Sequence, residues 1–80
     1  MFVVYIIKND LTEKYYTGST NNFERRLSEH NRHQTKSTKS KGMWYLIYME
    51  EYNSNIDAIR RERKIKSFKG GNAFRRLISS

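Results

Sequence analysis

The hydrophobic pattern of the chain begins with two short apolar and aromatic runs. The run VVYII starts at residue 3, and a second run, YYTG, starts at residue 15 after a polar segment containing Asn9 and Asp10. Both runs are too short for helices and rich in β-branched and aromatic residues, so they predict a β-hairpin. Asn9 and Asp10 favour the turn, because short polar side chains can bond to nearby backbone groups.

The register of this hairpin decides which side chains meet. With the turn centred between Asp10 and Leu11, Tyr5 lies opposite Tyr16. Opposite residues share a face, so the two tyrosines would lie side by side. A slip of one residue would separate them.

A helix is predicted to follow the hairpin, with Asn21 as its cap, because Glu24 comes three residues later and precedes an apolar-periodic segment. The inward stripe of this helix, set by spacings of three, four and seven residues, contains Phe23, Arg26, Leu27 and His30. An arginine and a histidine are unusual on such a stripe. The guanidinium needs an anionic partner there, and phosphate is one candidate because its oxygens fit the planar fork.

Two contrasting segments occupy the middle of the chain. Residues 31–42 are polar, basic and without periodicity, which predicts an exposed loop. Residues 43–52 read MWYLIYMEEY, with apolar side chains on both faces, which predicts a central strand covered on each side. We expect Trp44 to lie in the core of the protein.

A second helix is predicted from a capping box formed by Ser54 and Asp57, and it runs to about Phe68 before Gly70 and Gly71 end it. Glu62 falls on or beside the inward stripe of this helix. It is either a member of a surface ion pair with a neighbouring arginine or a carboxylate that holds a hard cation such as Mg²⁺. A short last helix is predicted over residues 72–78.

Length and cysteine content limit the class of protein. Eighty residues form one small domain over residues 1–80, with a modest core. The lack of cysteine excludes a disulfide framework and a cysteine-based metal site. The apolar run at residues 2–7 is too short to span a membrane and has no basic flank of a signal peptide, so we expect a soluble cytoplasmic protein.

The charge of the chain favours a nucleic-acid partner. There are 16 Lys and Arg residues against 8 Asp and Glu residues, a formal net charge of +8, and 14% of the residues are aromatic. The positive charge is clustered, because eight basic residues and one acid, Glu62, lie between residues 60 and 76. The side chains expected to contact the phosphate backbone are Lys36, Lys39, Lys41, Arg60, Arg63, Lys66 and Lys69.

The inward polar groups have the chemistry that phosphodiester cleavage requires. They are Tyr5, Tyr16, Arg26, His30 and Glu62. Cleavage needs activation of a nucleophile, stabilisation of charge on the phosphate and help for the leaving oxygen. An arginine can bind the phosphate oxygens, and a metal on one carboxylate can act as Lewis acid and template. A tyrosine can accept a proton only if its ordinary pKa of about 10 falls, which a nearby cation favours.

These residues, in their order along the chain, resemble the GIY-YIG nuclease domain family, and in particular its short stand-alone members. The resemblance runs from residue 3 to about residue 77 and is carried by Val3-Val4-Tyr5, Tyr16-Thr17-Gly18, the segment RLSEH from Arg26 to His30, and Glu62. The first tripeptide has two valines where the family name has glycine and isoleucine, and the second has Thr17 in place of isoleucine. The late asparagine of the family has only Asn72 as a counterpart, in a glycine-rich context.

The resemblance implies an α+β fold, with a three-stranded antiparallel sheet flanked by helices, and a nuclease that uses one divalent ion, Mg²⁺ or Mn²⁺. It implies that Tyr5 and Tyr16 share the role of base or water-positioning group, and which of them is the base stays open. By the same resemblance Gly18 lets the backbone pass close to the site and Arg26 stabilises the phosphate. His30, four residues after Arg26, would be a supporting residue of the site. Glu62 would bind the metal.

The leading hypothesis is therefore a metal-dependent endonuclease that hydrolyses DNA. Without a second domain its base-sequence specificity should be poor, so recognition of single strands, flaps or branches is favoured. The alternatives are a nucleic-acid-binding module of the same fold with little or no cleavage, an RNA-directed nuclease and a purely structural domain.

Overall fold

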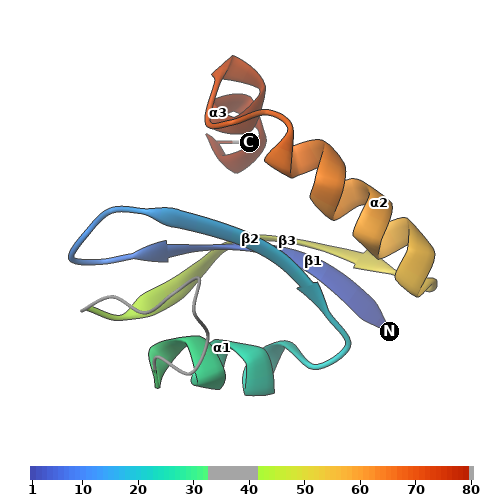
Figure 1. The fold of residues 1–80 in the computed structure, drawn as a ribbon, viewed down its shortest axis with the longest axis horizontal. Helices are drawn as coiled ribbons and strands as arrows, with labels where there is room; N and C mark the ends of the chain where they lie inside the picture. Colours follow the sequence, from blue (N-terminus) through green and yellow to red (C-terminus); the bar gives the residue numbers. More distant parts are fainter. Residues whose placement is uncertain (33–41, 80) are drawn as a thin grey trace.

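The computed structural model describes residues 1–32 and 42–79 of the chain. Its strands are β1 (Phe2–Asn9), β2 (Tyr15–Thr20) and β3 (Trp44–Tyr52), and its helices are α1 (Phe23–Asn31), α2 (Asn55–Lys66) and α3 (Asn72–Ser79). The strands form one antiparallel sheet in the order β2-β1-β3. Helix α1 covers one face of this sheet, and α2 and α3 cover the other (Figure 1). The predicted α+β class and three-stranded antiparallel sheet are thus confirmed.

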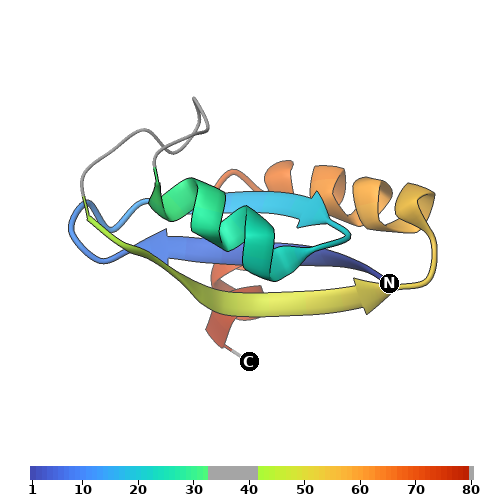
Figure 2. The same cartoon turned by 90° about the horizontal axis from the view of Figure 1, so that it is seen from below.

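Strand β1 is the central strand and supplies both cores (Figure 2). Successive side chains of a strand point to opposite faces. Val4 and Ile6 pack against α2 and α3 in a cluster that includes Ala58, Ile65 and Phe74. Val3, Tyr5 and Ile7 pack on the α1 face with Trp44. A strand buried on both faces has to be apolar at consecutive positions, which is what its sequence shows.

The expectation that residues 43–52 form the central strand is wrong, because β3 pairs only with β1 and lies at an edge. Its aromatic side chains fit an edge, where a tyrosine ring can pack while its hydroxyl reaches a polar partner. Tyr45 and Leu46 are exposed. Trp44 is 4% exposed, as predicted for a core residue.

The predicted hairpin register is wrong by two residues. Tyr5 lies opposite Gly18, and Tyr16 lies opposite Ile7. The turn is wider than expected because the Asn9 side chain accepts hydrogen bonds from the backbone N–H groups of residues 11 and 12, each at 2.9 Å. A shift of two residues keeps every side chain on its face. Tyr5 and Tyr16 therefore still share the α1 face, with ring centroids 6.3 Å apart.

The helix starts follow their capping residues. Helix α1 is capped by Asn22, whose side chain accepts from the Arg25 N–H at 3.2 Å, and not by Asn21 as predicted. The Thr20 hydroxyl accepts from the Asn22 N–H at 3.1 Å, which joins the end of β2 to the helix start and selects the second asparagine. Helix α2 has the predicted cap, Ser54. None of the helices within residues 1–32 and 42–79 is long and apolar enough to cross a bilayer.

Candidate active site

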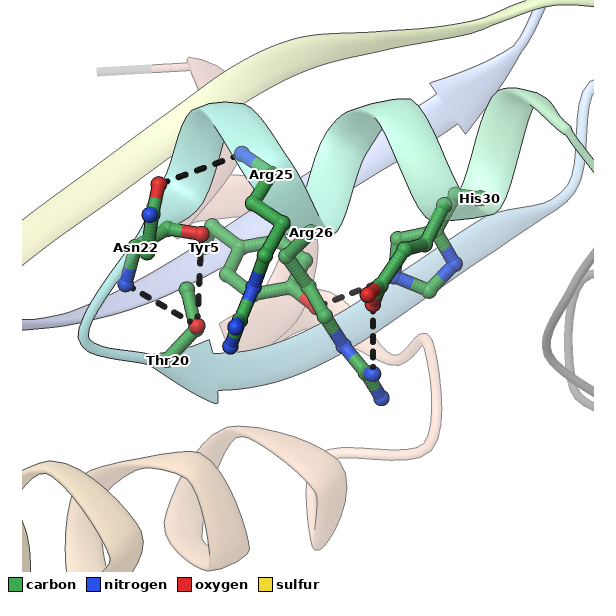
Figure 3. A network of polar contacts seen from close by, with 7 residues as sticks. Tyr5, Thr20, Asn22, Arg25, Arg26 and His30 are labelled. Carbon is green, nitrogen blue, oxygen red and sulfur yellow. Dashed lines mark hydrogen bonds and ion pairs between the residues drawn. The ribbon is translucent and has the colours of Figure 1, made fainter.

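Tyr5 and His30 form a buried pair at the centre of the α1 face. The Tyr5 hydroxyl lies 3.0 Å from Nε2 of His30 (Figure 3). Tyr5 is 1% exposed and His30 is 0% exposed. Phe23 packs edge-on against the Tyr5 ring, with centroids 5.3 Å apart. The predicted inward stripe of α1 is thus present, and its histidine is held by a strand residue 25 positions earlier.

Burial keeps both groups neutral. Burial, with a smaller effect of the Arg26 charge, lowers the pKa of His30 to about 4. Burial also raises the pKa of Tyr5 to about 12, although the interaction with Arg26 acts in the opposite direction. At neutral pH the imidazole is therefore uncharged and the phenol keeps its proton. One of the two supplies the hydrogen of their bond, and the tautomer of the imidazole decides which.

Gly18 faces Tyr5 on the neighbouring strand, where a side chain could not fit. A Cβ at this position would lie 2.6 Å from the Tyr5 hydroxyl oxygen and 3.0 Å from Cε1 of Tyr16. Both distances are at or below the closest approach of packed carbon atoms, so one of the rings would have to move. Glycine at position 18 is required by the two tyrosines, and the backbone of β2 passes directly over the Tyr5 hydroxyl.

Tyr16 is the more accessible of the two tyrosines. It is half-buried on the edge strand β2. Its ring centroid lies 4.6 Å from that of His30. The Lys66 ammonium lies 5.9 Å from the centroid of the same ring, within the range of a cation–π contact. Tyr16 therefore connects the buried pair with charged groups at the edge of the sheet.

Arg26 lies between the tyrosines and solvent. Its side chain is 35% exposed, and its Nη1 lies 3.1 Å from Oε1 of Glu29. Hydrogen bonding to the Tyr5 hydroxyl raises the pKa of Arg26, so the guanidinium is charged at any working pH. An exposed guanidinium whose position is fixed by a phenol and a carboxylate can bind an incoming phosphate bidentately.

Glu62 approaches the same edge of the sheet from α2. Its Oε1 accepts a hydrogen bond from the Ser19 hydroxyl at 2.5 Å, and its Oε2 lies 2.7 Å from the Lys66 ammonium. Ser19 directly follows Gly18, and the negative charge of Glu62 contributes to the raised pKa of Tyr5. One of the two interpretations of Glu62 was an ion pair with a neighbouring arginine. Glu62 does form an ion pair, but its partner is Lys66.

The carboxylate of Glu62 is compatible with the single divalent ion that the sequence resemblance implies. Among residues 1–32 and 42–79 no cluster of three or more His, Cys, Asp or Glu side chains could hold a metal, which excludes an all-protein cage in this part of the chain. Mg²⁺ commonly needs only one or two carboxylates, because water and substrate phosphates complete its shell. Glu62 could provide that one carboxylate once Lys66 releases Oε2.

The other predicted residues are spread more widely. Asn72 is exposed at the start of α3. Arg60, Arg63 and Lys69 are exposed, as phosphate-contacting residues would be. The predicted contacts at Lys36, Lys39 and Lys41 lie outside the described residues.

Two contacts of Glu62 were not predicted from the sequence, although Lys66 itself was expected to contact the phosphate backbone. Lys66 lies four residues after Glu62, a spacing that brings side chains together on a helix and could have identified the pair. Ser19 gave no signal, because its contact with Glu62 joins positions 43 residues apart.

Known protein families and proteins are similar to this chain over most of its length. The model of the GIY-YIG catalytic domain matches residues 1–73. A UPF0213 protein of Staphylococcus haemolyticus is 41% identical over 66 residues, which cover 81% of this chain and 79% of that protein. A UPF0213 protein of Staphylococcus aureus is 36% identical over the same shares of the two chains.

A solved structure has the same fold. The solution NMR structure of the UPF0213 protein BH0048 from Bacillus halodurans matches with a TM-score of 0.62 and 27% identity, over 99% of this chain and 84% of that one. The chain therefore belongs to the GIY-YIG family of nuclease domains.

Proposed function

We propose that this protein is an endonuclease that hydrolyses DNA phosphodiester bonds with the help of one divalent ion, Mg²⁺ or Mn²⁺. The observation that carries the proposal is the buried Tyr5–His30 pair, 3.0 Å apart, beneath a glycine that the tyrosines require. Two charged groups of the kind that phosphate chemistry needs lie nearby: Arg26 interacts with the Tyr5 hydroxyl, and the carboxylate of Glu62 accepts a hydrogen bond from Ser19, next to Gly18. A domain with only a structural role would have no need of a partly exposed arginine fixed against a buried phenol–imidazole pair.

Arg26 is the proposed phosphate-binding group. Its charge is permanent, and contacts with Tyr5 and Glu29 hold it in place. Fixed positive charge aimed at a reacting phosphate stabilises the charge that develops in the transition state. His30 and Tyr5 are positioning residues in this account, because both are buried and neutral at neutral pH.

Tyr16 is the proposed group that orients the attacking water. It keeps partial exposure, whereas Tyr5 is 1% exposed and has a pKa of about 12, which makes Tyr5 a poor base. Water attacks phosphorus, the bond from phosphorus to the leaving oxygen breaks, and the leaving oxygen takes up a proton. Glu62 would hold the divalent ion, which would supply Lewis-acid stabilisation of the developing charge.

The proposed substrates are single-stranded or branched DNA. A domain of this size offers few elements that could read base edges in a duplex groove, whereas its positive charge follows a phosphate backbone of any sequence. Strand structure would then decide which bonds are cut.

The pairing of Glu62 with Lys66 favours a second candidate function, a nucleic-acid-binding module with little cleavage. In the described structure both carboxylate oxygens already have partners. If a divalent ion does not displace the Lys66 ammonium from Glu62, the basic surface still binds phosphates but the protein does not hydrolyse them.

A cleavage assay separates the two candidates. End-labelled single-stranded, duplex, flap and branched DNA of one sequence, with an RNA strand added, would be incubated with Mg²⁺, with Mn²⁺ and with a chelator. The nuclease proposal requires metal-dependent products, most abundant on single-stranded or branched DNA. Binding to every substrate without products would establish the binding module instead.

A further inference from the structure

A groove on the other face of the sheet lies between α2 and α3. It has a volume of about 410 Å³ and is lined by Arg61, Phe68, Ala73, Arg76 and Leu77. Figure 1 shows the two helices meeting on the side of the sheet opposite α1. The groove is shallow and widely open to solvent, which suits one part of an extended ligand better than an enclosed small molecule.

Arg61 forms a fixed wall of this groove. Its Nε and Nη2 donate to the two oxygens of Glu50 at 2.9 and 3.0 Å. The hydroxyls of Tyr48 and Tyr52 donate to the same carboxylate. A bidentate pair that is supported in this way holds the guanidinium plane in one orientation. Because Glu50 is fully engaged, it adds little negative charge toward an incoming anion.

Arg76 is the free cation of the groove. Its exposed side chain has no ion-pair partner among residues 1–32 and 42–79. Between residues 60 and 80 the sequence contains one acid, Glu62, and Glu62 is paired with Lys66 on a different side of α2. The surroundings of the groove are therefore positive and complementary to a polyanion.

The remaining wall is apolar and partly aromatic. Phe68 and Leu77 are half-buried and pack on one side against the core of the α2–α3 face, and Ala73 adds a small side chain to the lining of the groove. An aromatic ring with guanidinium groups beside it is the arrangement on which nucleic-acid bases stack without regard to sequence. An acidic peptide would use the arginines but would leave the ring without a planar partner. A second copy of this chain, with a net charge of +8, would bring like charges together.

We propose that this groove binds one nucleotide of a single DNA strand, with its base against Phe68 and Leu77 and its phosphate on Arg76. The proposal rests on the proposed function, because the strand bound here is the one offered to Glu62. Arg61 and Glu62 are consecutive on α2 and point about 100° apart. Arg61 contacts β3 through Glu50, and Glu62 contacts β2 through Ser19, so one strand that crosses α2 can reach both places.

The test is the affinity for a fluorescent 12-nucleotide thymidine strand, measured by anisotropy at low salt with a chelator present. Arg76→Met should weaken binding by roughly fivefold or more, and it should lower the salt dependence by about one single-strand phosphate contact, a slope change of about 0.7. Ala73→Leu fills the groove without changing charge and should weaken binding by a similar factor. Leucine is a good helix former, so α3 is expected to persist.

Arg75→Met is the matched control, because Arg75 is exposed on the same helix and does not line the groove. It removes the same charge and should weaken binding less than twofold. Equal losses for the two arginine variants, with no effect of Ala73→Leu, would show diffuse charge attraction and overturn the proposal. Sedimentation showing that Ala73→Leu splits a dimer would overturn it in favour of an interface between copies.

The same samples separate this proposal from the proposed function. Binding is read in chelator, where no metal-dependent cleavage occurs, and cleavage is read with Mn²⁺ added. If groove variants weaken binding while the wild-type protein cuts nothing, the groove stands and the nuclease function fails. If the protein cuts DNA and the groove variants bind as the wild type does, the groove fails alone.

Discussion

The backbone of Gly18 lies against the hydroxyl of Tyr5, so closely that a Cβ at position 18 would come within 2.6 Å of that oxygen. Tyr5 in turn contacts Nε2 of His30 at 3.0 Å. Gly18 on β2, Tyr5 on β1 and His30 on α1 therefore lie in contact one after the other. Arg26 interacts with the Tyr5 hydroxyl, and the Tyr16 ring lies beside that of Tyr5 with centroids 6.3 Å apart.

Gly18→Ala should remove cleavage and destabilise the protein. Overpacking of a core typically costs about 1–3 kcal/mol, and the displaced tyrosines would disturb Arg26 as well. Urea denaturation and a cleavage assay measure the two effects. Gly70→Ala is the control: position 70 has a φ of 72° and open space around a Cβ, so this change strains the backbone by about 1–2 kcal/mol and should leave the cleavage rate of the folded protein unchanged.

Stability should fall on acidification because of His30. Its pKa is lowered to about 4 in the folded protein, against about 6.5 in the unfolded chain. Between these pH values the unfolded state binds a proton that the folded state does not. The contribution of His30 to the free energy of unfolding is therefore fully present above about pH 6.5 and is lost as the pH falls toward 4. The total loss is about 3 kcal/mol. Urea denaturation at pH 7 and pH 4.5 measures it.

His30→Gln is the control for that measurement, because carboxylates begin to titrate at its acid end. Burial acts to raise the pKa of Glu50, but hydrogen bonds from Arg61 and the tyrosines outweigh it and lower the pKa. The stability that Glu50 contributes is therefore lost only below about pH 4.5, outside the window of His30. The variant should therefore be less stable at pH 7 and show a smaller pH dependence than the wild type. An equal pH dependence of the two proteins would contradict the neutral buried state of His30.

The two tyrosines should respond differently to loss of the hydroxyl. Tyr16→Phe should lower kcat by about 100-fold or more, as removal of a water-orienting or proton-transfer group does, with little change in the free energy of unfolding. Tyr5→Phe should destabilise the protein by about 1–3 kcal/mol, because it leaves a buried imidazole nitrogen without its partner. Steady-state kinetics and urea denaturation provide the measurements. A larger kcat loss for Tyr5→Phe at unchanged stability would reverse the assigned roles.

Lys66→Met should strengthen binding of Mn²⁺ to the free protein. In the described structure the ammonium lies 2.7 Å from Oε2 of Glu62, where it competes with a divalent ion. The side chain of Lys66 is 51% exposed, and an exposed pair of this kind limits the expected gain to roughly two- to fivefold. Titration of Mn²⁺ by electron paramagnetic resonance measures it. Lys64→Met removes a charge from the same helix without touching Glu62, and a gain as large in that variant would assign the effect to general electrostatics.

The sequence was sufficient for features that follow from local spacing. The inward stripe of α1, the Ser54 cap and the position of Glu62 on α2 depend on helical periods and on contacts within one turn, so they were predicted correctly. The GIY-YIG resemblance likewise depends on residues whose order is visible in the chain.

Features that depend on contacts between distant residues were not predicted. The register of the hairpin is set by the Asn9 side chain, which widens the turn. The edge position of β3 follows from competition with β1, whose apolar residues take the centre. The choice of Asn22 over Asn21 depends on a contact from Thr20. The hydrogen bond between Ser19 and Glu62 exists only once α2 has folded back on β2.

In the proposed reaction, Glu62 and a divalent ion promote cleavage of DNA beside the Tyr5–His30 pair. The most direct measurement is the cleavage of one labelled single strand by the wild-type protein and by Glu62→Gln, each with Mn²⁺ and with a chelator. We expect products only for the wild type with metal and a rate at least about 100-fold lower for the variant. The strand affinity and the stability of the two proteins should be equal. Products from the wild type in chelator, or equal rates for the two proteins with metal, would contradict it.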